Sequence, residues 1–379
     1  MPAPDAMIIP FLSFGPQHTP IREEILAAVA EVYDSQWYVL GQQVLNFEAA
    51  YSLLAGTRYC VGVGNGLDAL HLSLRVLGIG PGDEVLVPSN TYIATWLAVS
   101  YVGATPVPVE PDPATYNLDP ARIEAAITSR TRAIMPVHLY GQACEMEAIM
   151  ALARQHKLMV VEDNAQAHGA TASGQPTGSF GQANATSFYP GKNLGALGDA
   201  GAITTDSEDL ARELQLLRNY GSPRKYYNEV IGYNSRLDEL QAAVLLVKLR
   251  HLAEWTRQRQ QIARWYGEQL QGIELLTLPQ TAPGSTHVYH LYVVRTARRD
   301  ALQQHLTAAG IGSLIHYPVP PHQQQAYACL AYPAGTFPLA EELAATCLSL
   351  PLWPGMTELQ VEQVAREIRR FFRLLPQGS

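Results

Sequence analysis

The sequence has few cysteines, no long apolar run and no basic stripe. Its four cysteines, among 379 residues, are scattered and show no spacing typical of a metal site. Reduced thiols in a cytoplasmic protein are the simplest interpretation, and we expect no bound metal. No stretch of 18 apolar residues is present, and residues 1–10 lack a basic segment followed by an apolar one. The sequence therefore predicts neither a membrane span nor a signal peptide.

Positive charge is also scarce. The formal net charge is −8, and no cluster of Lys and Arg forms a stripe, so we expect no nucleic-acid partner. An anionic substrate is not excluded, because a few local cations can bind one inside an acidic protein. The hydrophobic share of 47% indicates a globular protein, and 379 residues exceed the size of one typical core. One large domain and one smaller domain are expected.

Short apolar segments alternate with helical patterns between about residues 50 and 220. The pattern predicts strands at Arg58–Val63, Glu84–Pro88, Pro106–Glu110, Arg132–His138, Leu158–Asp163, Ala185–Tyr189 and Gly201–Thr205. It predicts helices at Asn65–Leu77, Thr91–Val102, Pro120–Ile127 and Glu145–His156. Such alternation favours an α/β domain with a mostly parallel sheet, whose binding sites lie at the carboxyl ends of the strands.

The pattern changes near residue 235. Ser235–Asp238 is typical of a helix N-cap with an acid three residues later, so we expect a long helix from there to about Leu270. Polar residues increase over Arg250–Gln260, where we expect the chain to pass from a large domain, residues 1–250, into a small α+β domain, residues 251–379. The small domain is predicted to hold a strand at His290–Thr296 and helices at Arg299–Ala309 and Glu358–Leu374.

A glycine-rich segment, Gly62-Val-Gly64-Asn-Gly66, follows one predicted strand and precedes a helix. It fails as a dinucleotide fingerprint, because Leu67 stands where the third glycine is required. Free N–H groups and the positive end of the helix still suit a phosphate. A phosphate site and a plain structural turn are equally open on this motif alone.

Two further motifs carry ionisable groups at predicted strand ends. Glu162 and Asp163 end an apolar strand, where carboxylates are costly to desolvate unless a ligand or a capping role supplies partners. Lys192 lies on a glycine-rich loop among apolar neighbours. A lysine is normally a solvated surface residue, but an apolar setting lowers its protonation and suits imine formation.

Together the three motifs match the needs of pyridoxal phosphate. This cofactor requires an amine for an imine, an anion opposite its ring nitrogen, donors for its phosphate and a flat surface against its ring. In that order the sequence offers Lys192, Asp163, the Gly64–Leu67 turn with Ser187, and Tyr92.

The chain resembles the nucleotide-sugar aminotransferases of the DegT/DnrJ/EryC/StrS family, which have the fold-type I architecture of aspartate aminotransferase. The similarity extends from about Ile9 to Phe372. It is carried by six motifs: Gly64-Asn-Gly-Leu-Asp-Ala-Leu, Pro88-Ser-Asn-Thr-Tyr-Ile-Ala-Thr, Val137-His-Leu-Tyr-Gly, Glu162-Asp-Asn-Ala-Gln-Ala-His-Gly, Ser187-Phe-Tyr-Pro-Gly-Lys-Asn-Leu-Gly and Asn234-Ser-Arg-Leu-Asp-Glu-Leu-Gln-Ala-Ala.

The resemblance implies a role for each matching residue. Lys192 would hold pyridoxal phosphate as a Schiff base and then move a proton between Cα of the amino donor and the cofactor's C4′ carbon. The other implied contacts are Asp163 to the pyridine nitrogen, Gln166 to the phenolic oxygen, Tyr92 stacked on the ring, and the backbone of Gly66 and Leu67 with the Ser187 hydroxyl on the phosphate.

The resemblance also implies a homodimer with shared active sites. Asn234 would reach the phosphate in the neighbouring subunit, although capping of the helix that follows it is an alternative. Lys225 and Tyr227 belong to a segment, Arg218–Asn228, that could supply cations and aromatic surface for the nucleotide diphosphate, within its own subunit or across the dimer interface. An ordinary solvated loop is equally open for this segment.

The sequence around Lys192 and His316-Tyr-Pro-Val-Pro-Pro-His322 is similar to that of members that aminate C3 of a 3-keto-6-deoxyhexose bound to dTDP. L-Glutamate as donor and a dTDP-3-amino-3,6-dideoxyhexose as product are implied. Tyr189, His316 and Tyr317 are candidate sugar contacts. Alternatives are a UDP-linked 3-keto uronic acid and amination at C4.

Three neighbouring polar residues are not expected to be catalytic. His138 is expected to be a structural histidine, and Glu162 to be structural or substrate-facing. His168 is expected to hydrogen-bond the carboxylate of Asp163. Other reactions are less compatible with the sequence, since Lys192 argues against a dehydratase and the broken glycine fingerprint argues against a nicotinamide-dependent oxidoreductase.

Overall fold

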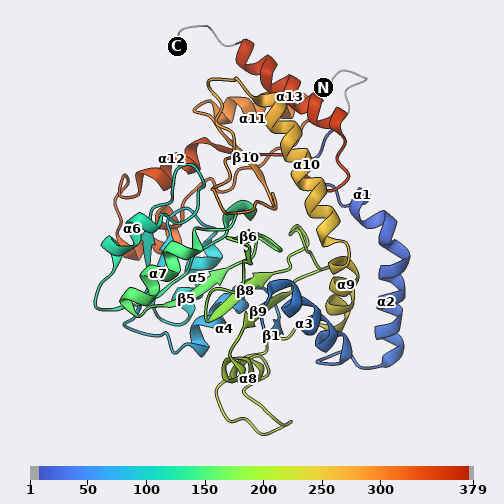
Figure 1. Cartoon of the computed structure of the whole chain (residues 1–379), viewed down its shortest axis with the longest axis vertical. Helices are drawn as coiled ribbons and strands as arrows, with labels where there is room; N and C mark the ends of the chain where they lie inside the picture. Colours follow the sequence, from blue (N-terminus) through green and yellow to red (C-terminus); the bar gives the residue numbers. More distant parts are fainter. Residues whose placement is uncertain (1–7, 375–379) are drawn as a thin grey trace.

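A computed structural model describes residues 8–374 and contains a seven-stranded sheet (Figure 1). The strand order is β1-β9-β8-β5-β4-β2-β3, and only β9 runs antiparallel to its neighbours. The strands are β1 Tyr59–Val63, β2 Glu84–Pro88, β3 Thr105–Val109, β4 Thr131–Ile134, β5 Met159–Asp163, β8 Ala183–Ser187 and β9 Gly201–Thr205. The predicted mostly parallel α/β sheet is confirmed.

Both faces of this sheet are covered by helices. Val85 and Val87 of β2 pack into the apolar core under α4, α5 and α8, whereas Leu86 between them packs into a second cluster with α6 and α7. The helices α3 and α9 cover the face of β1 and β9. Since alternate side chains of a strand point to opposite faces, burial on both faces explains why these strands are apolar almost throughout.

The helices connect and flank the strands. Their bounds are α1 Gly15–His18, α2 Arg22–Ser35, α3 Gln42–Ala55, α4 Gly66–Val76, α5 Ile93–Tyr101, α6 Pro120–Ala126, α7 Met146–His156, α8 Glu208–Leu217, α9 Glu239–Leu249, α10 Leu252–Leu270, α11 Arg299–Ala308, α12 Pro338–Thr346 and α13 Glu358–Arg373. The expected helices between strands, and those in the C-terminal part, agree with this set within a few residues. The helices α1, α2, α3, α8 and α12 were not anticipated.

The long helix expected from Ser235 is divided and begins later. Asp238 occupies the N-cap position of α9, and the helix is interrupted at residues 250–251, before α10 begins. Ser235 does not cap a helix: its Oγ donates to Asp68 Oδ2 at 2.6 Å and accepts from the Gly64 N–H at 3.1 Å. The capping prediction was wrong because the side chain is used in a long-range contact with the turn after β1.

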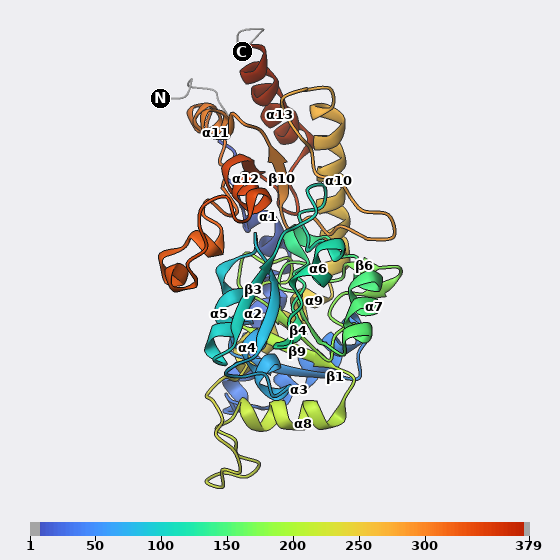
Figure 2. The same ribbon diagram turned by 90° about the vertical axis from the view of Figure 1, so that its left-hand side faces the viewer.

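A second apolar core lies at one end of the molecule. It contains side chains from α10, α11, α13 and an antiparallel pair of strands, β10 Tyr292–Arg295 and β11 Cys347–Leu350. Ile9, from the start of the chain, is fully buried in this core and pairs in parallel with Ile311. The two orthogonal views show α11, α13 and β10 at one end and the loop after α8 at the other (Figures 1 and 2). The boundary between residues 250 and 251 stays a prediction.

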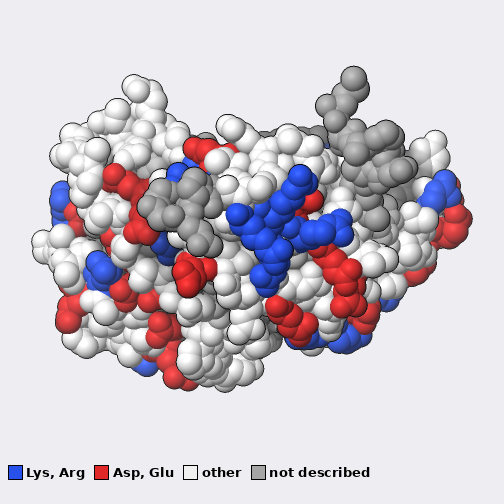
Figure 3. Space-filling view, turned by 90° about the horizontal axis from the view of Figure 1, so that it is seen from above, with Lys and Arg blue, Asp and Glu red and all other residues white. Residues whose placement is uncertain are grey.

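One local concentration of positive charge was not anticipated. Four arginines of α13, Arg366, Arg369, Arg370 and Arg373, line one shallow depression. Figure 3 shows Lys and Arg side chains gathered on this end of the molecule, with acidic side chains beside them.

None of the described helices is long and apolar enough to cross a membrane. Within residues 8–374, no three His, Cys, Asp or Glu side chains gather in an arrangement suited to a metal ion.

Candidate active site

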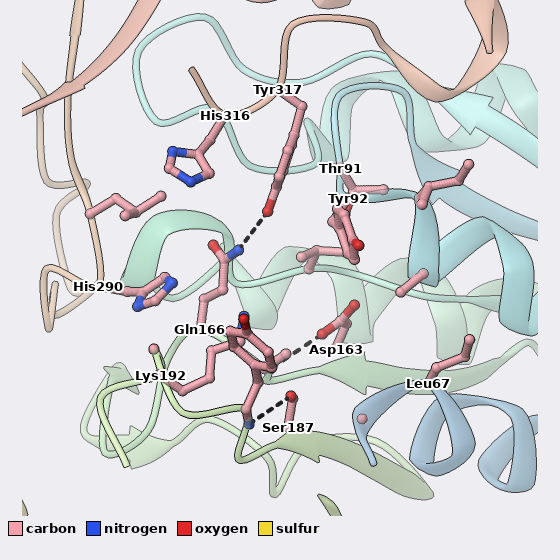
Figure 4. Close-up of a pocket in the computed structure, with 18 of the residues that line it drawn as sticks. Leu67, Thr91, Tyr92, Asp163, Gln166, Ser187, Lys192, His290, His316 and Tyr317 are labelled. Carbon is pink, nitrogen blue, oxygen red and sulfur yellow. Dashed lines mark hydrogen bonds between the residues drawn. The ribbon is translucent and has the colours of Figure 1, made fainter. Parts of the chain in front are cut away.

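The carboxyl ends of β1, β2, β5 and β8 meet at a cavity of about 910 Å³. Its floor comes from the segments that follow these strands, and its opposite wall comes from the second core, through Leu350, Leu352 and the residues at 314–317. Gly66, Leu67, Tyr92, Asp163, Gln166, Ser187, Tyr189, Lys192, His316 and Tyr317 all line it. The structure thus brings together most of the residues singled out from the sequence (Figure 4).

The N-terminus of α4 forms one side of the cavity. Asn65 caps this helix, its side chain accepting from the Asp68 N–H at 2.8 Å. The N–H groups of Gly66 and Leu67 follow, and the first N–H groups of a helix lack acceptors within it. A Cβ at Gly66 would overlap the Ser187 side chain, so only glycine lets the helix end approach that hydroxyl. This cradle of N–H groups and a hydroxyl suits a phosphate.

Asp163 lies buried at the end of β5. Thr95 donates its hydroxyl to Asp163 Oδ2 at 2.9 Å, and the Ala165 N–H donates to Oδ1 at 3.2 Å. Burial raises the pKa of this carboxyl, and the two hydrogen bonds and the nearby Lys192 oppose that shift. A carboxylate desolvated in this way gains from a protonated nitrogen placed against it.

Lys192 is partly buried on the loop after β8. Burial lowers its pKa to about 8, and the nearby Asp163 carboxylate opposes this effect. One side of the loop is held by α9, because the Nζ of Lys248 donates a hydrogen bond to the Gly195 carbonyl at 2.6 Å. Its other side is fixed by Asn193, whose Nδ2 donates to the Val288 carbonyl at 3.2 Å. A lysine that loses its proton near neutral pH can act as a nucleophile and as a proton carrier.

Two aromatic side chains and an amide line the middle of the cavity. The rings of Tyr92 and Tyr317 lie 5.2 Å apart between centroids and tilt by 37°. Gln166 donates Nε2 to the Tyr317 hydroxyl at 3.0 Å, and its Oε1 accepts from the Tyr140 N–H at 2.6 Å. The amide is thereby oriented with its NH₂ group toward the cavity side occupied by Tyr317 (Figure 4).

Three of the expected site residues are not in this cavity. Lys225 and Tyr227 lie on the exposed loop after α8, where Arg224 stacks over the Tyr227 ring at 3.9 Å from its centroid. That loop extends away from the molecule at the end opposite α13 (Figure 2). Asn234 is exposed and does not cap α9, because Asp238 occupies that position.

The neighbouring histidines differ in their environments. His138 and Glu162 form a fully buried pair, with Nε2 and Oε2 2.7 Å apart, and Glu162 also accepts the N–H groups of Gly178 and Phe180. Both are structural, as expected. The His168 prediction was wrong: its Nε2 lies 3.0 Å from the Ser187 carbonyl, and no hydrogen bond within residues 8–374 joins it to Asp163.

Four other side chains at the site were not among the expected site residues. Thr95 and Ser235 support Asp163 and the turn after β1, while Arg259 of α10 and His290 line the cavity beside Lys192. Each lies more than 60 residues from the group that it supports or neighbours in the cavity. Thr95 and Ser235 fall within two of the quoted motifs, but nothing local indicates these contacts, and Arg259 and His290 fall in none of the motifs.

The set fits pyridoxal phosphate on chemical grounds. The cavity holds an amine with a lowered pKa, a buried carboxylate, a helix N-terminus beside a hydroxyl, and tyrosine rings. Comparison with known families gives the same result, because residues 19–369 match the model of the DegT/DnrJ/EryC1/StrS aminotransferase family. The chain belongs to the DegT/DnrJ/EryC1/StrS aminotransferase family.

Curated members of this family are similar over nearly their whole length. The chain is 50% identical to the dTDP-3-amino-3,4,6-trideoxy-alpha-D-glucose transaminase of Streptomyces venezuelae, covering 98% of each. It is 50% identical to the dTDP-3-amino-3,6-dideoxy-alpha-D-galactopyranose transaminase of Aneurinibacillus thermoaerophilus, over 96% of this chain and 99% of that protein. It is 51% identical to the erythromycin biosynthesis sensory transduction protein EryC1 of Saccharopolyspora erythraea, over 96% and 99%.

Solved structures of family members have the same fold. A structure of S. venezuelae DesV in complex with a ketimine intermediate matches with a TM-score of 0.95 at 50% identity, covering 97% of this chain and 99% of that one. A structure of NtdA from Bacillus subtilis with bound cofactor PMP matches with a TM-score of 0.91 at 31% identity, covering 98% and 87%. The aspartate aminotransferase-like fold expected from the sequence is therefore confirmed.

Proposed function

We propose that this aminotransferase uses pyridoxal phosphate to move the amino group of L-glutamate to C3 of a dTDP-3-keto-6-deoxyhexose. The product is a dTDP-3-amino-3,6-dideoxyhexose. The observation that carries the proposal is identity of about half of all residues, over almost the entire chain, with two relatives named as dTDP-3-amino-sugar transaminases. The cavity supports the proposal because it holds an amine, a buried carboxylate and a helix N-terminus beside a hydroxyl.

Each site residue has a defined task in this proposal. The bound cofactor supplies an electrophilic carbon that accepts the amino group and a ring that accepts electrons. Lys192 would hold the cofactor and would carry the proton to and from Cα of the donor. Asp163 would keep the ring nitrogen protonated, and the α4 N-terminus with Ser187 would bind the phosphate. Tyr92 would cover the ring, and Gln166 would hydrogen-bond its phenolic oxygen.

Tyr189, His316 and Tyr317 are proposed to contact the sugar. All three line the cavity, and His316 and Tyr317 come from the wall that belongs to the second core. Burial lowers the pKa of His316 to about 4, with a contribution from Lys192, so the ring is neutral at physiological pH. A neutral ring can accept as well as donate a hydrogen bond, which suits recognition of sugar hydroxyl groups.

The substrate assignment is tested by spectroscopy on the purified protein loaded with pyridoxal phosphate. We expect a yellow protein that bleaches with L-glutamate and recovers its colour when dTDP-3-keto-6-deoxyglucose is added. Recovery with a UDP-linked 3-keto uronic acid and none with the dTDP sugar would show that the substrate class is wrong. A 4-keto sugar that restores colour more efficiently would move the reaction from C3 to C4.

The active unit is proposed to be a homodimer. Large apolar side chains of α2, α3 and the segment between them are exposed, among them Leu53 at 82%, Tyr33 at 72% and Trp37 at 65%. Asn234 lies outside the cavity of its own chain, and so does the loop that carries Lys225 and Tyr227. A second copy would cover the apolar surface and bring these polar residues to the partner's cavity.

Mixing two inactive variants tests the shared site. In a hybrid of Lys192→Ala and Asn234→Ala chains, the cavity with an intact Lys192 receives Asn234 from the other chain. We therefore expect activity to return on mixing, up to one competent cavity per hybrid dimer, whereas each variant alone stays impaired. Activity is measured after co-refolding and compared with each variant refolded by itself. No gain on mixing would show that Asn234 acts within its own chain or not at all.

A further inference from the structure

Arg259 of α10 is a buried cation without a charged partner. Its side chain is 2% exposed and lines the same cavity as Lys192. Nη1 donates to the carbonyls of Tyr289 at 3.2 Å and His290 at 3.4 Å, while Nε has no acceptor. Within residues 8–374, no carboxylate forms an ion pair with this guanidinium. A buried charge of this kind normally has a counter-ion, because desolvation is otherwise costly.

The surroundings of Arg259 favour an anion. Burial lowers the pKa of Arg259 to about 10, so the group remains a cation at neutral pH. Burial lowers the pKa of His290 and of His168, and Lys192 and Arg259 both add to these shifts. The two cations therefore act on the same two rings, both of which stay neutral. Asp163 and Asp199 also line the cavity, but within residues 8–374 neither forms an ion pair with Arg259, so a negatively charged ligand would supply the counter-ion that this guanidinium lacks.

The cofactor phosphate is not expected to be the counter-ion of Arg259. Its proposed cradle is the α4 N-terminus with Ser187, whereas Lys192 and His290 lie on the other side of the cavity from Leu67 (Figure 4). The other anions in the proposed reaction are the diphosphate of the dTDP sugar and the carboxylate of the amino donor. The diphosphate is joined to C1 of the sugar, two carbons from the keto carbon that reacts, whereas the α-carboxylate is attached to the reacting carbon of the donor and so enters the cavity with it. Among the residues that line the cavity, Lys192 and Arg259 are the Lys and Arg side chains, and Lys192 is committed to the cofactor.

We infer that Arg259 binds a carboxylate of the amino-acid donor and so forms the donor subsite beside Lys192. This inference rests on the proposed function. The planar guanidinium makes both carbonyl contacts through Nη1, and Nε has no acceptor within residues 8–374, so the group keeps unused donor capacity that a carboxylate can meet. The keto sugar arrives without that carboxylate, so its binding does not depend on Arg259. One cavity can thereby accept two dissimilar substrates in turn.

Arg259 also holds the segment that flanks Lys192, and this role must be separated from ligand binding. Gln260, the next residue on α10, donates Nε2 to the His287 carbonyl at 3.1 Å and fixes the same segment without a charge. Gln260→Ala is therefore the control for a purely structural effect. Arg264→Gln is the control for loss of charge, since Arg264 is exposed on the same helix and lies outside the cavity.

The test compares Arg259→Gln and Arg259→Lys with these controls in two measurements. Calorimetry follows the binding of glutarate, a dicarboxylate that has no amino group and does not react. Stopped-flow absorbance follows the two half-reactions separately, bleaching by glutamate and recovery by the keto sugar. For Arg259→Gln we expect the glutarate Kd and the half-saturating glutamate concentration to rise about 10–100-fold, as for loss of a charge-assisted hydrogen bond. The keto-sugar half-reaction stays near wild type.

The outcomes separate the possible explanations. Arg259→Lys retains the charge and is expected to lie between wild type and Arg259→Gln. A loss shared by glutamate and glutamine assigns Arg259 to the α-carboxylate, and a loss for glutamate alone assigns it to the side-chain carboxylate. If Arg259→Gln impairs both half-reactions equally, as Gln260→Ala would, the inference is overturned. If the wild type neither bleaches with glutamate nor binds glutarate, the donor in the proposed function is wrong and the inference fails with it.

Discussion

Replacing Lys192 with alanine is expected to lower amino transfer by at least about 10⁴-fold, because both covalent attachment of the cofactor and proton transfer at the donor's Cα are lost. The variant is also expected to lose the yellow colour of the loaded protein. Steady-state assays and absorbance spectra measure both effects. The chain has four lysines, and Lys157→Ala is the matched control because that lysine is exposed at the end of α7.

The lowered pKa of Lys192 adds a pH dependence to this prediction. With a pKa of about 8, the amine of the apoprotein is mostly neutral above pH 8 and mostly charged below it. The rate of cofactor capture should therefore rise with pH and level off near pH 8, about two units below an ordinary lysine. Lys192→Arg is not expected to restore capture, since a guanidinium stays protonated. Capture that continues to rise up to pH 10 would contradict a desolvated amine at this position.

Asp163→Asn is expected to lower kcat by about 10²–10⁴-fold, which corresponds to the cost of about 3–5 kcal/mol for breaking a buried ion pair. The neutral amide cannot hold a proton on the ring nitrogen, so the cofactor accepts electrons less readily. Half-reaction kinetics with glutamate measure the effect. Asp209→Asn, an exposed carboxylate in the first turn of α8, is the matched control. A change of less than tenfold would remove Asp163 from this role.

The same variant has an opposite effect on the stability of the apoprotein. Burial raises the pKa of Asp163, so the folded apoprotein keeps this proton to a higher pH than the unfolded chain, whose aspartate pKa is near 3.9. The stability from this group is complete below that pH and is lost as the pH rises through the folded pKa. Without cofactor at neutral pH, Asp163→Asn should therefore unfold at the wild-type temperature or above it. Calorimetry of both apoproteins measures the difference.

The sheet and the cofactor residues could be predicted from the sequence because their signals are local. Strands buried on both faces, such as β2, are continuous apolar segments. Asp163 is the last residue of one such strand, and Lys192 lies on the loop that follows another. The helix α2 lacks this signal, because large side chains such as Leu26 and Tyr33 are exposed and blur its apolar face. A helix that has apolar side chains on its exposed face as well as on its buried face does not show the amphipathic pattern that predicts a surface helix.

Long-range contacts account for the other differences. Ser235 precedes α9 in a sequence typical of a helix cap. Its hydroxyl instead accepts a hydrogen bond from the N–H of Gly64, in the turn after β1, which lies 171 residues earlier. Arg259 is one of several polar residues in a helix, and only the fold shows that it is buried and lines the same cavity as Lys192. The sequence alone does not show which of these polar residues is buried, since burial depends on which elements pack together.

The position of Ile9 has a consequence for how the chain can fold during its synthesis. Its N–H donates to the Gly310 carbonyl at 3.0 Å, and its carbonyl accepts from the Gly312 N–H at 2.8 Å. About 300 residues therefore leave the ribosome before this early segment meets its partners, and α13, which completes the same core, follows last. The sheet can form while the chain is still growing, whereas the second core waits for release. The active cavity, which borrows one wall from that core, is thus among the last parts of the molecule to mature.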